Sequence, residues 1–281
     1  MLNAKVLVSG AEFFALDAPI NPYYDHNPVN VSDAVAEHAT IIQAFSDAGM
    51  EIVRVTPPST SQDGVYTANW GLVRGDKVIL SRLPNARRSE EEYATKIFRD
   101  LGLTVITVPD DWRFSGQGDA LPCGKYLLAG SGYRSDPRAT KFAAETLGLE
   151  LVQLHAVPEL DANQNPVINQ SSGWADSFFY DIDLAIAVLR DDLIAYCPDA
   201  FDEQSRVKIA GLPVEKIEVS YEEATKGLAC NLVSTGETVI MSAHAPNLKS
   251  EIEKRGLSVA TINAPELARG GGYIRCVSLT L

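Results

Sequence analysis

The sequence predicts an α/β fold built from a repeated unit of two strands, a helix and a third strand. Short runs rich in β-branched residues alternate with amphipathic stretches along all 281 residues. The unit returns about every fifty residues, so about five copies fit the chain around a central axis. A content of 46% hydrophobic and 22% charged residues allows a large core and leaves no room for a long disordered segment. We expect residues 1–281 to form a single domain, and an ordinary mixed α/β domain is the alternative.

The expected elements keep the same order in each copy. The first helix is expected to begin with Ser32 as its N-cap and to end before Gly49. The expected helices are residues 32–48, 90–101, 138–147, 202–210 and 245–255. The expected strands are residues 6–9, 51–55, 65–73, 77–81, 103–108, 120–121, 125–130, 150–155, 184–189, 193–197, 217–219, 231–234, 237–241, 258–263 and 273–281. Residues 157–174 lack periodicity, which indicates either a domain boundary or a loop over a functional site.

The net charge of −13 argues against nucleic acid and anionic membrane surfaces as partners. No apolar run reaches the roughly 20 residues that cross a bilayer, and the N-terminus lacks the pattern of a signal peptide. The four cysteines are far apart, without the spacing of a zinc site, so we expect no metal and a reducing, cytoplasmic location. No nucleotide-binding motif is present, and no cofactor is expected. A small molecule is the expected partner, and a homodimer is left open.

A run of three glycines near the end of the chain precedes Cys276 by a few residues. Glycines without side chains let a backbone approach a ligand closely or adopt positive φ, and Gly271 lies in the middle of the run. A thiol beside such a loop can be reached by substrate and can act as a nucleophile. Taken alone, a buried structural cysteine in a terminal strand explains the same residues.

Six further segments, in order, give this motif a context. They are Asn21-Pro22-Tyr23-Tyr24, residues 65–73 with Asn69, residues 114–121, residues 130–136, residues 179–183 and Asn231. With the triple glycine and Cys276, they resemble the pentein superfamily of amidinohydrolases and amidinotransferases, which includes dimethylarginine dimethylaminohydrolases and arginine dihydrolases. The resemblance covers nearly the whole chain. It implies a five-bladed α/β propeller and covalent chemistry on the guanidino group of arginine or a substituted arginine.

The resemblance also implies roles for residues around the substrate. Cys276 would be the nucleophile, and Asn69 would hydrogen-bond the guanidino nitrogens. Arg134 would hold an α-carboxylate with its bidentate fork, although a surface-turn arginine is the alternative. Arg87 or Arg88 could hold the carboxylate instead.

The remaining contacts would come from loops and carboxylates. Asn21 would touch the substrate from its loop, although an Asn-Pro turn explains it too. Asp119 and Asp183 would hold the cation, and the backbone at Gly271 would lie close to the substrate.

Two departures from the family pattern concern catalysis. Ser115 stands where the family has a catalytic Glu, and Asp181 stands where it has the acid-base His. Histidine titrates near neutral pH, whereas a carboxylate needs burial or a second carboxylate to do so. None of the four histidines is an obvious substitute, and His26 is the nearest candidate by sequence.

Three hypotheses remain open from the sequence. The first is an enzyme that uses Cys276 as nucleophile, Asp181 as base and Ser115 in place of the Glu. The second is a protein that binds a guanidino compound without efficient turnover. The third is a different reaction, made possible by the carboxylate at position 181 and the hydroxyl at position 115.

Overall fold

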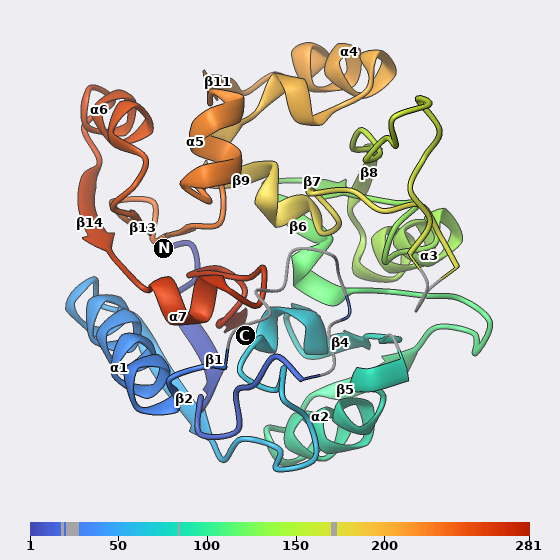
Figure 1. Cartoon of the computed structure of the whole chain (residues 1–281), viewed down its shortest axis with the longest axis vertical. Helices are drawn as coiled ribbons and strands as arrows, with labels where there is room; N and C mark the ends of the chain where they lie inside the picture. Colours follow the sequence, from blue (N-terminus) through green and yellow to red (C-terminus); the bar gives the residue numbers. More distant parts are fainter. Residues whose placement is uncertain (18–19, 21–27, 84, 170–172) are drawn as a thin grey trace.

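The computed structural model describes residues 1–17, 20, 28–83, 85–169 and 173–281. In this part of the chain, fifteen strands form five sheets of three strands each. Figure 1 shows the longer helices at the outer rim and both chain ends near the centre. The predicted fold of about five ββαβ units around an axis is therefore confirmed.

Each sheet has a middle strand that pairs antiparallel with one neighbour and parallel with the other. The orders are β15-β1-β2, β3-β4-β5, β6-β7-β8, β11-β10-β9 and β12-β13-β14. The first sheet contains both chain ends, because β15 from the C-terminus pairs with β1. This pairing closes the ring.

The strands have the following bounds: β1 Lys5–Ser9, β2 Glu51–Val55, β3 Gly71–Arg74, β4 Lys77–Leu80, β5 Thr104–Thr107, β6 Ala120–Cys123, β7 Tyr126–Ala129, β8 Glu150–Gln153, β9 Ile186–Arg190, β10 Leu193–Tyr196, β11 Glu215–Glu218, β12 Val233–Ser234, β13 Thr238–Ser242, β14 Ser258–Ile262 and β15 Leu279–Thr280. The helices are α1 Val31–Asp47, α2 Ser89–Asp100, α3 Pro137–Leu147, α4 Glu203–Gly211, α5 Tyr221–Lys226, α6 Pro246–Glu253 and α7 Pro265–Ala268. Helices α5 and α7 were not expected from the sequence, because six and four residues are too few to show a clear helical period.

Side-chain caps explain where several helices begin. The Asn30 side chain accepts a hydrogen bond from the Asp33 amide and caps α1, so the expectation that Ser32 is the cap was wrong. Asp136 caps α3 in the same way, and Gly148 ends that helix in the left-handed conformation. Buried apolar residues of α1, such as Ile41 and Phe45, pack on the sheet through the same core cluster as Val6.

Two of the expected strands are shorter in the structure. In each case a turn replaces part of the strand near the axis of the ring. Residues Thr67–Trp70 form a buried 3-10 turn, η1, before β3 begins at Gly71. The final strand contains only Leu279–Thr280, so Cys276 lies in a turn and not in a strand. The two turns are joined, because the Ala68 amide donates to the Cys276 carbonyl at 3.0 Å. A turn there lets the chain present side chains along the axis.

The segment after β8 has little regular structure. Within residues 157–169 and 173–175, isolated bridges join Leu160 to Pro166 and Ile168 to Ala175. The Asn169 side chain donates to the Ile20 carbonyl at 3.4 Å, which places this loop beside the segment near residue 20. Among the described residues, no helix combines the length and the apolar character needed to span a bilayer.

Candidate active site

The glycine run is required by close packing against Tyr66. A Cβ atom at Gly270 would lie 2.3 Å from the Tyr66 hydroxyl, and one at Gly272 would lie 2.7 Å from the Tyr66 ring. Gly271 has a φ of +81°, which a residue with a side chain adopts only with strain. Its carbonyl accepts a hydrogen bond of 2.6 Å from the Tyr180 hydroxyl. The three glycines therefore allow the loop before Cys276 to lie directly on two tyrosines.

The Asn231 side chain fixes the turn that carries the nucleophile candidate. Its Oδ1 accepts from the backbone amides of Arg275 at 3.0 Å and Cys276 at 3.3 Å. Its Nδ2 donates to the Cys276 sulfur at 3.1 Å. Asn231 therefore holds the thiol in place and gives a hydrogen bond that favours the thiolate.

Three buried carboxylates surround the thiol region, each at most 2% exposed. The Cys276 thiol donates to Asp183 Oδ2 at 3.4 Å. Asp119 Oδ1 accepts from the Ile182 amide at 3.1 Å. Each of Asp119, Asp181 and Asp183 also has one carboxylate oxygen without a hydrogen-bond partner in the described part of the chain. Buried oxygens of this kind are costly unless a ligand or water pairs with them.

Burial and neighbouring charge shift the pKa values of these groups. Burial raises the pKa of the Cys276 thiol well above its usual value, and Asp183 raises it further. Burial, followed by the charge of Asp181, raises the pKa of Asp119 to about 7. The same two causes raise the pKa of Asp183 well above its usual value. A cation placed among these groups would favour all of their charged forms.

Asn69 connects Asp181 and Ser115, the two positions that depart from the family pattern. Its Nδ2 donates to Asp181 Oδ2 at 2.8 Å and to Ser115 Oγ at 2.9 Å. Its Oδ1 accepts from Arg87 Nη1 at 2.8 Å, which sets the orientation of the amide. A Cβ atom at Gly118 would lie 2.5 Å from Asn69 Nδ2, so the glycine loop must pass here without a side chain.

Arg134 lies inside the site and not at a surface turn, since its side chain is only 9% exposed. Its Nη1 is 3.6 Å from Asp181 Oδ2, and its guanidinium carbon lies 4.0 Å from the centre of the Tyr180 ring. Arg134 is therefore placed beside the carboxylate that replaces the family histidine.

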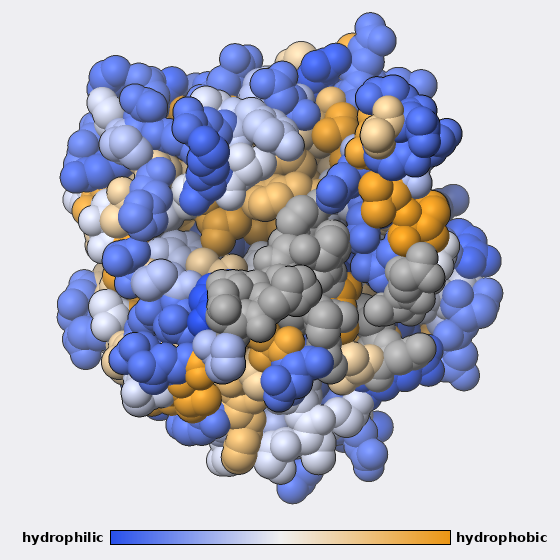
Figure 2. Space-filling model, viewed as in Figure 1, coloured by the Kyte–Doolittle hydropathy of each residue, from blue (hydrophilic) through white to orange (hydrophobic). Residues whose placement is uncertain are grey.

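A small cavity collects most of these residues. It is lined by Ile20, Tyr66, Asn69, Arg87, Arg134, Tyr180, Asp181, Gly270, Gly272 and Cys276. Its volume of about 10 Å³ holds about one water molecule. Figure 2 shows one face of the molecule, with mostly hydrophilic residues at its rim and patches of apolar residues inside the rim.

The contacts described above link most of the predicted site residues into one region. These residues are Cys276, Asp181, Ser115, Asn69, Asp119, Arg134, Asp183 and Gly271. Asn21 and His26 lie outside the described residues. His155 and His244 are engaged with Ser131 and Asn263, and no histidine is among the residues given above for the cavity.

Sequence reasoning gave no role to Tyr66, Tyr180 or Asn231 and only an alternative role to Arg87. The Arg87 guanidinium pairs with Glu90 at 2.7 Å, with both side chains at most 1% exposed. The sequence signal for this pair was an Arg three residues before a Glu at a helix start. Asn231 had a signal as well, because it belongs to the ordered series of motifs.

Comparison with known proteins agrees with this geometry. The chain is 31% identical over 271 residues to the N(G),N(G)-dimethylarginine dimethylaminohydrolase of Mycobacterium tuberculosis, covering 96% of this chain and 83% of that protein. It is 30% identical over 283 residues to the bifunctional arginine dihydrolase/ornithine cyclodeaminase ArgZ of Synechocystis, covering 99% of this chain. It spans only 37% of the length of ArgZ. No family model matches the chain.

A solved structure extends the agreement to the fold. The crystal structure of the N-terminal domain of ArgZ bound to substrate, an arginine dihydrolase from Cyanobacteria, superposes with a TM-score of 0.87 at 28% identity. The match covers 98% of this chain and 97% of that domain. Five blades around an axis, with a thiol among carboxylates, define a pentein of the guanidino-group-modifying class. The chain belongs to the dimethylarginine dimethylaminohydrolase family.

Proposed function

We propose that this protein acts on the guanidino group of arginine or a substituted arginine through a covalent adduct on Cys276. The observation that carries the proposal is the Cys276 thiol beside Asp183, in a buried site where three carboxylates each have an oxygen without a partner in the described chain. A planar cation with several N–H donors matches such a set of acceptors. The relatives named above support the substrate class, because their names specify arginine or dimethylarginine.

The buried carboxylates would hold the substrate before any bond changes. Asp181 lines the cavity and has an oxygen without a partner in the described chain, Asn69 keeps Asp181 oriented toward the cavity, and Asp119 and Asp183 add negative charge nearby. Bound guanidinium would offset the burial and the negative charge that raise the pKa of Cys276. The substrate would thus promote formation of the thiolate that attacks it.

The reaction would follow two steps. The sulfur of Cys276, after losing its proton, forms a bond with the guanidino carbon, the bond from that carbon to one nitrogen breaks, and the departing nitrogen takes up a proton from water, so that one proton is released and one is consumed. Water then adds to the carbon, the carbon–sulfur bond breaks, and the thiol is regenerated. Asp181 would act as base for the water, in place of the family histidine. Loss of an acid-base histidine costs about 10²- to 10⁴-fold in rate, so turnover should be slow.

Two alternatives keep the same pocket. A protein that binds guanidino compounds without turnover is favoured by the replacement of both the His and the Glu. A different reaction is favoured by the donation from Asn69 to both Ser115 and Asp181, which ties the two replaced positions into one network. Four free cysteines support a reducing compartment, and we propose a cytoplasmic protein that works as one domain over residues 1–281.

The test is a product assay with matched protein variants. Wild type and Cys276→Ser are each mixed with arginine and with methylated arginines, and citrulline, ornithine, ammonia and methylamines are measured. Product with wild type and none with Cys276→Ser supports the enzyme. A rise in melting temperature with arginine, without product, favours the binding alternative. Neither product nor thermal shift with any of these compounds contradicts the substrate class.

A further inference from the structure

A second cavity is lined by Asp183, which contacts the Cys276 thiol, and it is larger than the first. Its volume is about 120 Å³, enough for several water molecules. Residues that are half-buried surround its outer part, namely Leu2, Asn3, Pro122, Val188 and Thr280. Buried residues, including Asp183, Cys230 and Arg275, form its inner part. We call this space the axial cavity.

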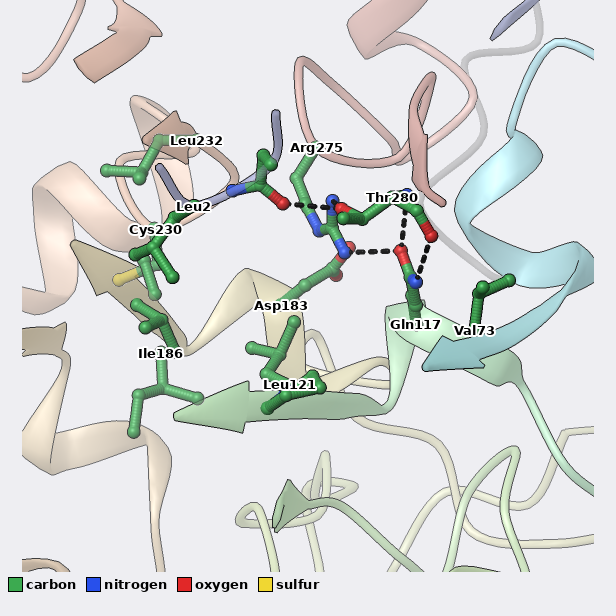
Figure 3. Close-up of a pocket in the computed structure, with 14 residues that line it drawn as sticks. Leu2, Val73, Gln117, Leu121, Asp183, Ile186, Cys230, Leu232, Arg275 and Thr280 are labelled. Carbon is green, nitrogen blue, oxygen red and sulfur yellow. Dashed lines mark hydrogen bonds between the residues drawn. The ribbon is translucent and has the colours of Figure 1, made fainter. Parts of the chain in front are cut away.

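Two neighbouring residues of the turn that carries the nucleophile line different cavities. Cys276 lines the small cavity described above, whereas Arg275 lines the axial cavity. The Arg275 guanidinium is fixed by Gln117 Oε1 at 2.7 Å and Thr280 Oγ1 at 3.1 Å (Figure 3). Figure 3 also shows Asp183 next to Arg275 and facing the same space.

Asp183 contacts both the Cys276 thiol and the axial cavity. Its Oδ2 accepts from the Cys276 thiol at 3.4 Å, and the residue also lines the axial cavity. Its Oδ1 has no hydrogen-bond partner in the described part of the chain, although Asp183 is only 1% exposed. Water in the axial cavity could satisfy that oxygen, because the space is polar at this end and large enough.

Asp181 is less suited to receive the thiol proton. It lines the small cavity on the substrate side, and its Oδ2 accepts from Asn69 at 2.8 Å and lies 3.6 Å from Arg134, whereas the Cys276 thiol donates to Asp183. The small cavity holds about one water, and bound substrate would occupy that space. Protons leaving Cys276 during catalysis therefore need a path away from the substrate side.

We propose that the axial cavity is a water-filled proton route and that Asp183 carries the thiol proton of Cys276 into it. The sulfur–hydrogen bond breaks and Asp183 Oδ2 gains the proton, leaving a thiolate. Asp183 then gives a proton to a cavity water, which exchanges with bulk solvent, and the carboxylate is restored. Arg275 is a positioning residue whose positive charge favours that carboxylate. This inference rests on the proposed function, since the released thiolate attacks the guanidino carbon.

The experiment closes the axial cavity at its outer end and measures two independent readouts. Val188→Trp fills the cavity from β9, and Leu2→Trp does so from the chain end, where less structure is at risk. Val207→Trp is the matched control, because Val207 is 68% exposed on α4 and is not among the residues that line either cavity. Circular dichroism and melting temperature verify that each variant is folded.

The first readout is access to the cavity, for which Cys230 is an internal reporter. Cys230 lines the axial cavity, whereas the buried Cys197 is not among its lining residues. Methyl methanethiosulfonate, followed by peptide mass mapping, should modify Cys230 of folded wild type before Cys197. A plugging substitution should slow Cys230 modification by about tenfold or more, as expected when a route to a buried thiol is blocked.

The second readout is turnover of the best guanidino substrate. Both plugging variants should lower kcat by about tenfold or more with little change in KM, because the acid-base path is lost and substrate binding is not. Val207→Trp should leave both readouts unchanged. Unchanged kcat in a variant that protects Cys230 overturns the proton route, as does the absence of Cys230 modification in wild type. If wild type turns over no guanidino compound, the proposed function fails separately, and the Cys230 readout decides whether the axial cavity is open.

Discussion

Two buried clusters of charge meet at Asn69, and they differ in how their hydrogen bonds are satisfied. In the first cluster, Glu90 accepts from Arg87 through both oxygens, at 2.8 and 2.7 Å. The same oxygens accept from Ser61 at 2.6 Å and from Trp70 at 2.8 Å. In the second cluster, Asp119, Asp181 and Asp183 each keep an oxygen without a partner among the described residues.

The difference separates a buried ion pair that supports the structure from carboxylates that we propose to bind a ligand. A buried ion pair with complete hydrogen bonding fixes its surroundings, and Arg87 uses a further N–H to orient Asn69. Incompletely paired carboxylates carry a desolvation cost that a bound cation can remove. Asn69 connects the two clusters and holds Asp181 in a fixed orientation, because its Oδ1 accepts from Arg87 and its Nδ2 donates to Asp181.

The strongest contrast between the clusters concerns stability. Arg87→Met leaves Glu90 as an unpaired buried charge, so the free energy of unfolding should fall by about 3–5 kcal/mol in urea denaturation. Asp183→Asn removes a repulsive charge from the other cluster and should leave the free energy of unfolding equal or higher. Equal losses in the two variants would contradict the distinction between the clusters.

A second contrast concerns catalysis at the two replaced positions. Restoring the family residues with the double variant Ser115→Glu and Asp181→His should raise kcat for arginine or a methylated arginine by about a hundredfold, since a positioned histidine supplies acid-base catalysis near neutral pH. Steady-state product formation measures this. The single variants serve as controls and should gain less. A double variant slower than wild type would favour the different-reaction hypothesis.

A smaller effect is expected from the titration of Asp119. Its pKa is raised to about 7 in the folded protein, so the folded state retains a proton that the unfolded chain releases at lower pH. Its contribution to stability is present below the unfolded pKa and is lost as pH rises through about 7. Between acidic and neutral pH, the free energy of unfolding of wild type should therefore fall relative to that of Asp119→Asn. Urea titrations at several pH values test this, and parallel curves would contradict it.

Local patterns in the sequence were enough to predict most of the fold. Residues 51–55 and 138–147 have periodic apolar positions and clear ends, and the structure forms β2 and α3 there. The recurrence of the ββαβ unit predicted the ring. The expected final strand was too long: Leu279–Thr280 form β15, whereas the backbone amides of Arg275 and Cys276 donate to the distant Asn231 side chain and form a turn.

The sequence indicated which residues to expect in the candidate site but not how their side chains are connected. Ordered motifs pointed to Cys276, Asp119 and Asp183, but the hydrogen bond between Asn69 and Asp181 joins residues 112 positions apart. No local pattern specifies such a pair. The axial cavity could not be predicted from the sequence for the same reason, because the residues that line it come from both chain ends and from several blades.

The central claim is that the unpaired carboxylates beside Cys276 are reserved for a cation, and calorimetry tests it most directly. Cys276→Ser, which is expected to remove turnover, is titrated with L-arginine and with L-citrulline, whose urea group is similar in shape but neutral. We predict that arginine binds more tightly by about tenfold or more, as expected for hydrogen bonds to charged groups. Equal binding of the two ligands, or tighter binding of citrulline, would contradict the claim.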